Sequence, residues 1–353
     1  MRIQTPQLPK EQSTQGKQHG FDLKTVSTTW YILAAVIVLL VVFTVLGPGV
    51  RFVSVENLQS LARNSSQFML LGIGLTYILG AGNIDLSVGS TLVLSSVVGS
   101  KTLLWVTGGQ EQASLGNYKN LPLAFIIAII TAIAVGAVAG WINGLLVTKF
   151  KIHSFVVTLG TMGVYLGISQ VITNGSNVPY LPRELQTSFG FKNVIGIPVP
   201  IAVAIIIGII AAFMLTNTTF GRHTLAVGSD LEGARRAGVN VNRTVVRGFV
   251  FTGALCGIAG FIDITRFATT AVSGHEMDIL TALSAVIIGG TSLFGGRASV
   301  LSTMFATFIP TILLSGFVIL GFGSFYQEIA IGAVLIIAVG IDRLRQHPAN
   351  FAS

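Results

Sequence analysis

The chain has 353 residues, 52% of them hydrophobic and only 10% charged, and its mean hydropathy is +0.78. Soluble domains carry about 25% charged residues, so the composition excludes a water-soluble globular protein and indicates an all-α polytopic membrane protein. The formal net charge of +8 is interpreted as loop charge that sets membrane topology, so membrane lipid is an expected partner and nucleic acid is not.

The first residues are polar and rich in Gln and Lys, without the periodicity of a helix or a strand. We therefore expect 1–29 to be a disordered cytoplasmic tail and 346–353 to be a second cytoplasmic tail. Between them, in 30–345, apolar segments approach the roughly 20 residues that a helix needs to cross a bilayer. The sequence predicts about ten transmembrane helices, some of them broken or re-entrant: 30–47, 66–81, 85–105, 121–147, 153–173, 197–215, 247–267, 281–293, 300–320 and 325–341.

The distribution of Lys and Arg sets the orientation, because cytoplasmic loops carry an excess of both. With the N-terminus inside, 14 of these residues fall in inside segments and 7 in outside segments, which sum to the 21 in the chain. Both termini and the polar loop 216–246 are then cytoplasmic, and loops 106–120 and 174–196 lie outside.

A polar motif, Asn83-Ile84-Asp85-Leu86-Ser87-Val88-Gly89-Ser90, separates the second and third predicted helices. An ionised Asp deep in a bilayer costs at least about 2.5 kcal/mol, so Asp85 should face a cavity or a partner. It could line a solute pathway, or it could cap the third helix near the interface, and the two roles do not exclude each other. The candidate pathway residues are Asn83, Asp85, Ser87 and Asn143. Asn143 lies inside the fourth helix, where an interhelical hydrogen bond explains it better than ligand contact.

Glycines recur every four residues in the fourth predicted helix, at Gly136, Gly140 and Gly144. Such a stripe lets two helices approach backbone to backbone. The partner helix could belong to the same subunit or to a second one, and we favour the same subunit. The spacing is repeated by Gly163 with Gly167 and by Gly253 with Gly257.

The polar loop 216–246 interrupts the apolar segments and carries a pattern typical of a short helix. Ser229 followed by Glu232 matches a capping box, and Gly238 can adopt the positive φ that closes a helix. The result would be a helix of about two turns, roughly 12 Å long. A membrane protein that builds a short capped helix on a basic loop is expected to present it to a partner.

Charged residues follow in the next segments. Asp263 and Arg266 are three positions apart, so they are expected to lie on one helix face and to pair locally. Glu276 and Asp278 are expected in a solvated outer loop. The eighth predicted helix is short and contains a double glycine, which favours a broken or re-entrant helix. Membranes tolerate such backbone only where protein or water covers it.

No catalytic or metal-binding arrangement is evident in the sequence. The single cysteine, Cys256, lies in an apolar segment, and the five histidines show no metal-ligand spacing. The chain has no GxxxxGK[ST] phosphate-binding loop, so we expect neither an enzyme nor a bound cofactor or metal. If ATP powers this protein, ATP and Mg²⁺ must be bound by a separate polypeptide.

Four motifs in the same order resemble those of the ribose-type sugar ABC-importer permeases. The segment 82–90 resembles the family signature Gly-Ile-Asp-Leu-Ser-Val-Gly. The other similar segments are 144–146 with 155–161, 226–241 and 286–297. Two departures stand out: Asn83 replaces a common Gly, and Ile279-Leu280-Thr281 replaces Glu-Leu-Asp. Together the motifs cover most of the chain from about 30 to 345.

This resemblance implies a permease domain over 30–345 in the bacterial plasma (inner) membrane, which translocates a small sugar or sugar-like solute. It also implies a second permease subunit, identical or related, a cytoplasmic ATP-binding subunit and an extracytoplasmic solute-binding protein. By analogy, the helix in 216–246 couples the permease to the ATPase, with the candidate residues Ser229, Glu232, Ala234, Arg235, Arg236 and Gly238. The alternative is an ion-coupled secondary transporter, which would need ionisable groups inside the membrane. Asp85 is nearly the only candidate for such a group.

Overall fold

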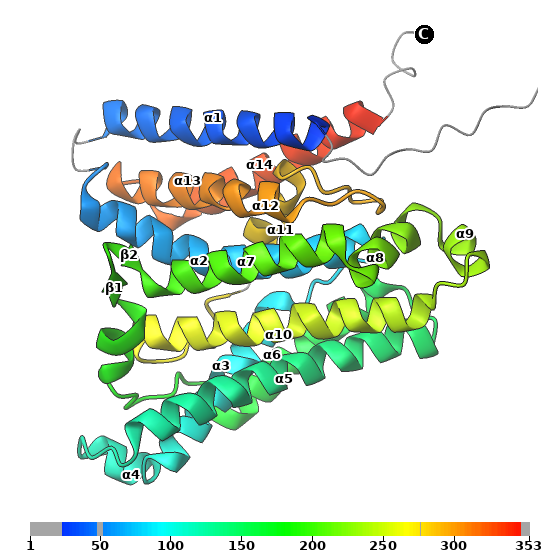
Figure 1. The fold of residues 1–353 in the computed structure, drawn as a ribbon. Coiled ribbons are helices and arrows are strands. Elements are labelled where there is room, and N and C mark those ends of the chain that lie inside the picture. The colour runs from blue at the N-terminus through cyan, green and yellow to red at the C-terminus, as the bar shows by residue number, and fades with distance from the viewer. Residues whose placement is uncertain (1–22, 48–51, 276, 347–353) are drawn as a thin grey trace, which may run out of the picture.

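The computed structural model of the chain describes residues 23–47, 52–275 and 277–346. Helices supply almost all of the regular structure in this part (Figure 1). The only sheet among the described residues is the antiparallel pair β1 (Asn193–Val194) and β2 (Ile197–Pro198). The helices are α1 (Leu23–Leu46), α2 (Val55–Gly80), α3 (Val88–Val106), α4 (Gly109–Ser114), α5 (Leu121–Lys149), α6 (Ser154–Thr173), the π-helix η2 (Gln186–Gly190), α7 (Val199–Asn217), α8 (Thr219–Ser229), α9 (Leu231–Arg236), α10 (Val241–Phe267), α11 (Asp278–Ile288), α12 (Val300–Ala306), α13 (Phe308–Ile319) and α14 (Ser324–Gln346).

Each predicted apolar segment falls on helical structure, with 300–320 shared between α12 and α13, which confirms the all-α polytopic class. Seven helical stretches among the described residues are long and apolar enough to cross a membrane. Helices α2, α11 and α14 are not among these seven, so about ten crossings remains a prediction. Helix α1 already begins at Leu23, within the predicted tail 1–29. Residues 1–22 and 347–353 of the predicted tails lie outside the described part.

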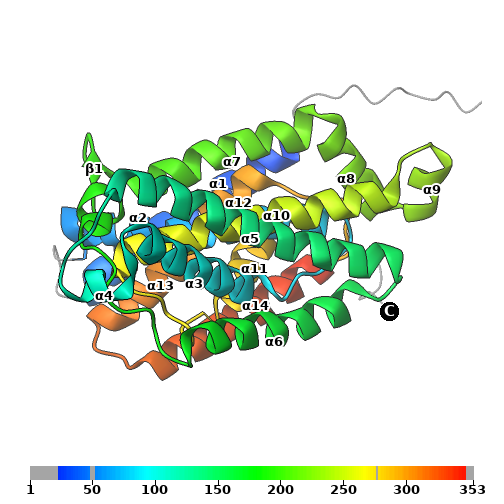
Figure 2. The same cartoon turned by 90° about the horizontal axis from the view of Figure 1, so that it is seen from below.

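The loops gather at two opposite ends of the helix bundle. Helix α9 projects at one end, whereas α4 and the β1–β2 hairpin lie at the other, in both views (Figures 1 and 2). The first residues of α1 and the last residues of α14 lie at the same end as α9 (Figure 1). The Lys and Arg distribution also predicts that these three segments share one side of the membrane, and that this side is the cytoplasm stays a prediction.

The glycine stripe of α5 packs against α10 of the same subunit. A Cβ atom added to Gly136 would lie 2.1 Å from the carbonyl oxygen of Gly253, and one added to Gly253 would lie 2.0 Å from that of Gly136. The two predicted stripes therefore face each other, as small residues do where helix backbones touch. On α6 the outcome differs, because nothing lies within 4 Å of a Cβ added to Gly163 or Gly167.

Two of the predicted spans are interrupted. Helix α11 has only 11 residues and ends at Gly289-Gly290, where Gly290 has a φ of 84°. The predicted span 300–320 is divided into α12 and α13 at Thr307. Pro310 explains this break, because it lacks the amide hydrogen that would bond to the carbonyl of Ala306.

Alanine at Gly140 is expected to destabilise the protein, because its Cβ would lie 2.0 Å from the carbonyl oxygen of Phe249 in α10. Overpacking of this kind costs about 1–3 kcal/mol. Thermal unfolding of the purified protein in detergent measures the effect as a lower Tm. The matched control is Gly163→Ala, which meets open space. An equal fall in Tm for both variants would contradict the assigned α5–α10 contact.

Candidate functional site

The polar loop between α7 and α10 folds into two helices, α8 and α9. Helix α8 begins after Thr218, whose Oγ1 accepts a hydrogen bond from the amide of Gly221 at 3.3 Å. Helix α9 begins after Asp230, whose Oδ1 accepts from the amide of Gly233 at 3.0 Å. The predicted cap is therefore displaced by one position: Ser229 ends α8, and Asp230 caps α9. Both residue types are good N-caps. Because α8 extends through Ser229, only Asp230 is left in the position that precedes α9.

The other end of α9 is closed as the sequence predicts. Gly238 has a φ of 83°, and its amide donates to the carbonyl of Arg235 at 3.0 Å. The amide of Val239 donates to the carbonyl of Ala234 at 3.0 Å. These two bonds form a Schellman motif, which needs a residue with positive φ at the position of Gly238.

Helix α9 has a buried side and a charged, exposed side. Ala234 is buried against an apolar cluster that includes Val241 and Val245 at the start of α10. Arg235 and Glu232 form an ion pair of 2.9 Å on the outer side, with 59% and 62% of their side chains exposed. Arg236 is also exposed. The packing holds α9 in place and leaves three charged side chains available to a partner.

The end of α8 touches two distant turns through glycines. A Cβ atom on Gly228 would lie 2.0 Å from the carbonyl oxygen of Gly80, at the end of α2, and 2.6 Å from the amide nitrogen of Gly296. The amide of Gly296 in turn donates to the carbonyl of Gly80 at 3.1 Å. The α8–α9 loop is thus in direct backbone contact with the turn after α2 and with the loop after α11.

The turn after α2 contains the first of the predicted pathway residues. Gly82 has a φ of 72°, and the amide of Asn83 donates to the carbonyl of Ile78 at 3.0 Å, which ends α2. The side-chain amide of Asn83 donates to the carbonyl of Ala81 at 3.1 Å. Asn83 is only half-buried and lines a cavity at the α9 end.

The other three predicted pathway residues form one buried hydrogen-bonded cluster. Oδ1 of Asp85 accepts from the amide of Ser87 at 2.9 Å and from its hydroxyl at 2.6 Å. The side-chain amide of Asn143 in α5 donates to the Ser87 hydroxyl at 2.8 Å, and the Tyr165 hydroxyl in α6 donates to Oδ1 of Asn143 at 3.2 Å. Asp85 therefore has a polar partner, and Asn143 joins α5 to α6 and to the turn before α3.

The predicted cap of the third helix by Asp85 is wrong, because Asp85 accepts from Ser87, which precedes α3, and not from an amide of the first turn. Ser87 occupies the N-cap position of α3 without a side-chain bond to the first turn. Asp85 instead holds Ser87 in place from outside the helix. Asp85, Ser87 and Asn143 line neither the cavity that Asn83 lines nor a smaller one of about 230 Å³ beside Gly89 and His275. Their role in a solute pathway stays a prediction.

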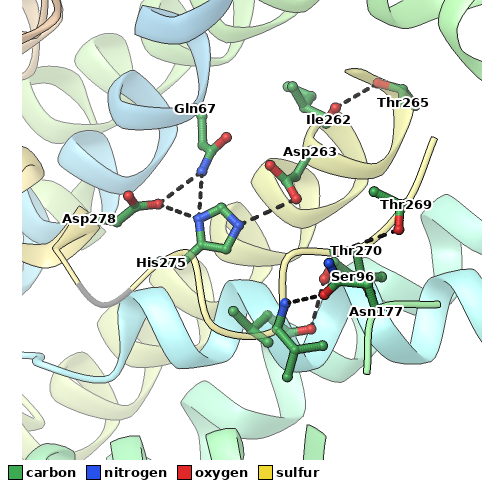
Figure 3. A network of polar contacts seen from close by, with 12 residues as sticks. Gln67, Ser96, Asn177, Ile262, Asp263, Thr265, Thr269, Thr270, His275 and Asp278 are labelled. Carbon is green, nitrogen blue, oxygen red and sulfur yellow. Dashed lines mark hydrogen bonds and ion pairs between the residues drawn. The ribbon is translucent and has the colours of Figure 1, made fainter. Parts of the chain in front are cut away.

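A second buried cluster centres on His275, in the loop between α10 and α11 (Figure 3). Nδ1 of His275 lies 2.7 Å from Oδ2 of Asp278, and its Nε2 lies 3.4 Å from Oδ2 of Asp263. The side-chain amide of Gln67 in α2 donates to Oδ2 of Asp278 at 2.9 Å. The cluster thus ties α2, α10 and α11 together through charged and polar side chains.

This cluster corrects two sequence predictions. Asp263 does not pair with Arg266, because it faces His275, whereas Arg266 donates to Oδ1 of Asn64 in α2. Asp278 is not a solvated loop residue, because it is 8% exposed and begins α11. Glu276 lies outside the described residues. Gln67, a polar residue at the start of the predicted span 66–81, was the available signal of a buried polar partner.

Tyr165 was also missed by sequence reasoning. It lies in an apolar helix, and its buried hydroxyl reaches both Asn143 and the carbonyl of Ala139, the latter at 2.9 Å. A buried Tyr hydroxyl usually has a partner, but the sequence gives no indication of which one. No group of His, Cys, Asp and Glu residues in the described part of the chain could hold a metal ion.

Comparisons with known proteins agree on the class of this protein. Residues 57–339 match the family model described as "branched-chain amino acid transport system / permease component". The ribose import permease of Escherichia coli (strain K12) is 31% identical over 89% of this chain and 93% of its own length. The ribose import permease of Bacillus subtilis (strain 168) is 34% identical over 87% and 90%, and the D-allose transport system permease of Escherichia coli (strain K12) is 32% identical over 90% and 91%.

No solved structure matches the chain. The family match and the relatives confirm the resemblance that the four sequence motifs indicated. The chain therefore belongs to the family of transport-system permease components, as its family match, its apolar helices and its relatives all indicate.

Proposed function

We propose that this chain is the membrane permease subunit of an ABC importer for a small sugar or sugar-like solute in the bacterial inner membrane. The observation that carries the proposal is the family match over 57–339 together with relatives whose names specify ribose and D-allose. ATP and Mg²⁺ are bound by a separate cytoplasmic subunit, because this chain contains no phosphate-binding loop. A second permease subunit and an extracytoplasmic solute-binding protein complete the importer.

Helix α9 is the element that couples the permease to the ATP-binding subunit. Its exposed Glu232, Arg235 and Arg236 are available to a protein groove, and its buried Ala234 fixes it to the start of α10. A short helix laid in a groove is a recurring mode of protein recognition. The opposite end, with α4 and the hairpin of β1 and β2, is then the surface for the solute-binding protein (Figure 2).

The glycine contact converts movement of α9 into movement of the membrane helices. Displacement of α8 would push on Gly80 through Gly228, because no side chain separates the two backbones. The turn that follows Gly80 carries Asp85, whose cluster reaches α5 and α6. The ATP-binding subunit thereby acts on three membrane helices, although it touches the permease only at its cytoplasmic end.

An ion-coupled carrier is the rival function, and the structure adds one observation in its favour that the sequence did not predict. Asp263, His275 and Asp278 form a buried ionisable cluster, of the kind that can mark an ion pathway. Uptake into vesicles separates the two functions. An importer powered by ATP keeps working when an uncoupler dissipates the ion gradient at constant ATP, whereas a carrier stops.

Glu232→Ala and Arg235→Ala are expected to reduce solute-stimulated ATP hydrolysis by about fivefold or more, because each removes an interface side chain. Both side chains are mostly exposed, so the amount and Tm of the permease should not change. The assay is ATPase activity of the reconstituted importer. Lys149→Ala is the matched control, since Lys149 is an exposed cation at the same end of the molecule that lies outside α9. Normal stimulation in both α9 variants would contradict the coupling role.

Gly228→Ala is expected to lower uptake, because its Cβ would overlap the Gly80 carbonyl at 2.0 Å and separate α8 from α2. The overlap costs about 1–3 kcal/mol if the backbones must shift. Uptake per reconstituted permease is the readout. Gly160→Ala, with nothing within 4 Å of its Cβ, serves as the control. Equal uptake by the two variants would show that the glycine contact is dispensable.

Asp85→Ala is expected to reduce uptake more than Asp263→Ala, at matched membrane levels. Loss of Asp85 removes the acceptor for two Ser87 donors, and unsatisfied buried donors cost about 1–3 kcal/mol each. Loss of Asp263 leaves His275 its shorter contact with Asp278, at 2.7 Å. Transport of labelled solute into proteoliposomes distinguishes the two. Near-normal uptake by both variants would remove Asp85 from the proposed pathway.

A further inference from the structure

A cavity of about 890 Å³ opens at the α9 end of the molecule. One wall is the turn after α2, with Asn83, and another is the connection between α5 and α6, with Lys151 and His153. The remaining wall comes from α9 and the start of α10, with Arg235 and Asn240. A protein that holds α9 must therefore meet the mouth of this cavity.

The walls of the cavity are basic. Lys151 and Arg235 contribute cationic groups, and none of the described residues that line the cavity is an Asp or a Glu. Arg235 already has Glu232 as its ion-pair partner, whereas Lys151 has no ion pair within the described part of the chain. An electrostatically complementary occupant would bring a carboxylate to Lys151.

The mouth of the cavity also exposes large apolar side chains. Ile152 is 40% exposed, Leu231 is 44% exposed and Phe294 is 58% exposed, and all three line the cavity. They belong to three segments that lie far apart in the sequence. Apolar side chains beside a small number of charges are the usual composition of a protein-binding surface, whereas a neutral sugar offers no charge to Lys151.

The backbone places Lys151 in an unusual conformation. Its φ is 57°, in the left-handed region that glycine adopts without cost and that other residues with a Cβ rarely occupy. Lys151 turns the chain between α5 and α6 and lines the cavity.

The same connection is joined to the turn that carries Asp85. The amide of Ile84 donates to the hydroxyl of Ser154 at 3.1 Å, and the hydroxyl of Thr158 donates to the carbonyl of Ile84 at 3.3 Å. A partner that grips the α5–α6 connection would therefore act on the turn before α3. This is the turn that Gly228 reaches from the other side.

We propose that this cavity is a second docking site for the ATP-binding subunit, which inserts a segment with an acidic side chain that pairs with Lys151. The inference rests on the proposed function and adds a contact to that of α9. The ATP-binding subunit would then contact the turn between α2 and α3 from two sides, through α8 and through the start of α6.

Zero-length carbodiimide coupling of the assembled importer tests the pairing directly, because it joins an amine to a carboxylate in contact with it. Mass spectrometry should identify a cross-link between Lys151 and an Asp or Glu of the ATP-binding subunit. Lys149 is the internal control, since it is an exposed amine two residues away that does not line the cavity. A cross-link at Lys149 without one at Lys151 would overturn the proposal.

Docking of α9 is measured separately, so that the coupling role of α9 and the second docking site can each be contradicted without the other. Cys256 is buried and is the only cysteine, so an Ala237→Cys variant with Cys256→Ser carries one accessible thiol at the exposed end of α9 for a short thiol–amine cross-linker. Cross-links from α9 without any from Lys151 would overturn the second docking site and leave the proposed function standing. Cross-links from neither would overturn both.

Removing the charge of Lys151 tests whether the proposed pairing contributes to binding of the ATP-binding subunit. Lys151→Gly keeps a residue that tolerates positive φ and removes the amine, so the fold should survive. The ATP-binding subunit should then bind the reconstituted permease about two- to fivefold more weakly. This difference should shrink at high salt, where exposed charges are screened. Lys149→Gln should bind normally, and equal weakening of both variants would contradict a specific role for Lys151.

Discussion

The arrangement of the α9 end depends on one contact between the backbones of glycines, which have no side chains. Gly228 lies so close to Gly80 and Gly296 that a single methyl group would overlap a carbonyl oxygen at 2.0 Å. Because three glycines meet there, the end of α8, the end of α2 and the loop after α11 pack at main-chain distance. Tight packing of this kind transmits displacement instead of absorbing it.

The polar clusters extend this contact into the membrane part. Asp85 holds Ser87, and Ser87 is joined to α5 by Asn143. At the start of α3, a Cβ on Gly89 would lie 2.6 Å from the carbonyl oxygen of His275. The first cluster is therefore adjacent to the second, which binds α2, α10 and α11 together. Asp85, Ser87 and Asn143 form a continuous hydrogen-bonded chain, whereas Oδ1 of Asp263 has no hydrogen-bond partner among the described residues. An unpaired buried polar atom is costly in an apolar surrounding.

Local rules predicted much of the fold and part of the site. The apolar segments located the helices, and the spacing of Gly136 and Gly253 indicated close helix contacts, although only the structure shows that these two stripes face each other. Gly238 was identified because a helix end needs positive φ. Ser229 was chosen over Asp230 because both can cap, and the decision depends on where α8 ends. That length is set by packing, which local sequence does not encode.

The remaining errors have a common physical cause, because buried charges choose partners by tertiary proximity. The i, i+3 spacing suggested that Asp263 would pair with Arg266, yet such a helix pair is worth only a few tenths of a kcal/mol. Burial raises the energetic cost of an unpaired charge above this value. Asp263 therefore lies against His275 and Arg266 against Asn64, and neither partner is a neighbour on the same helix turn. The same reasoning explains why Lys151 is informative. It is an exposed cation beside a cavity that no described Asp or Glu lines, so we propose that a carboxylate of another subunit supplies the complementary charge.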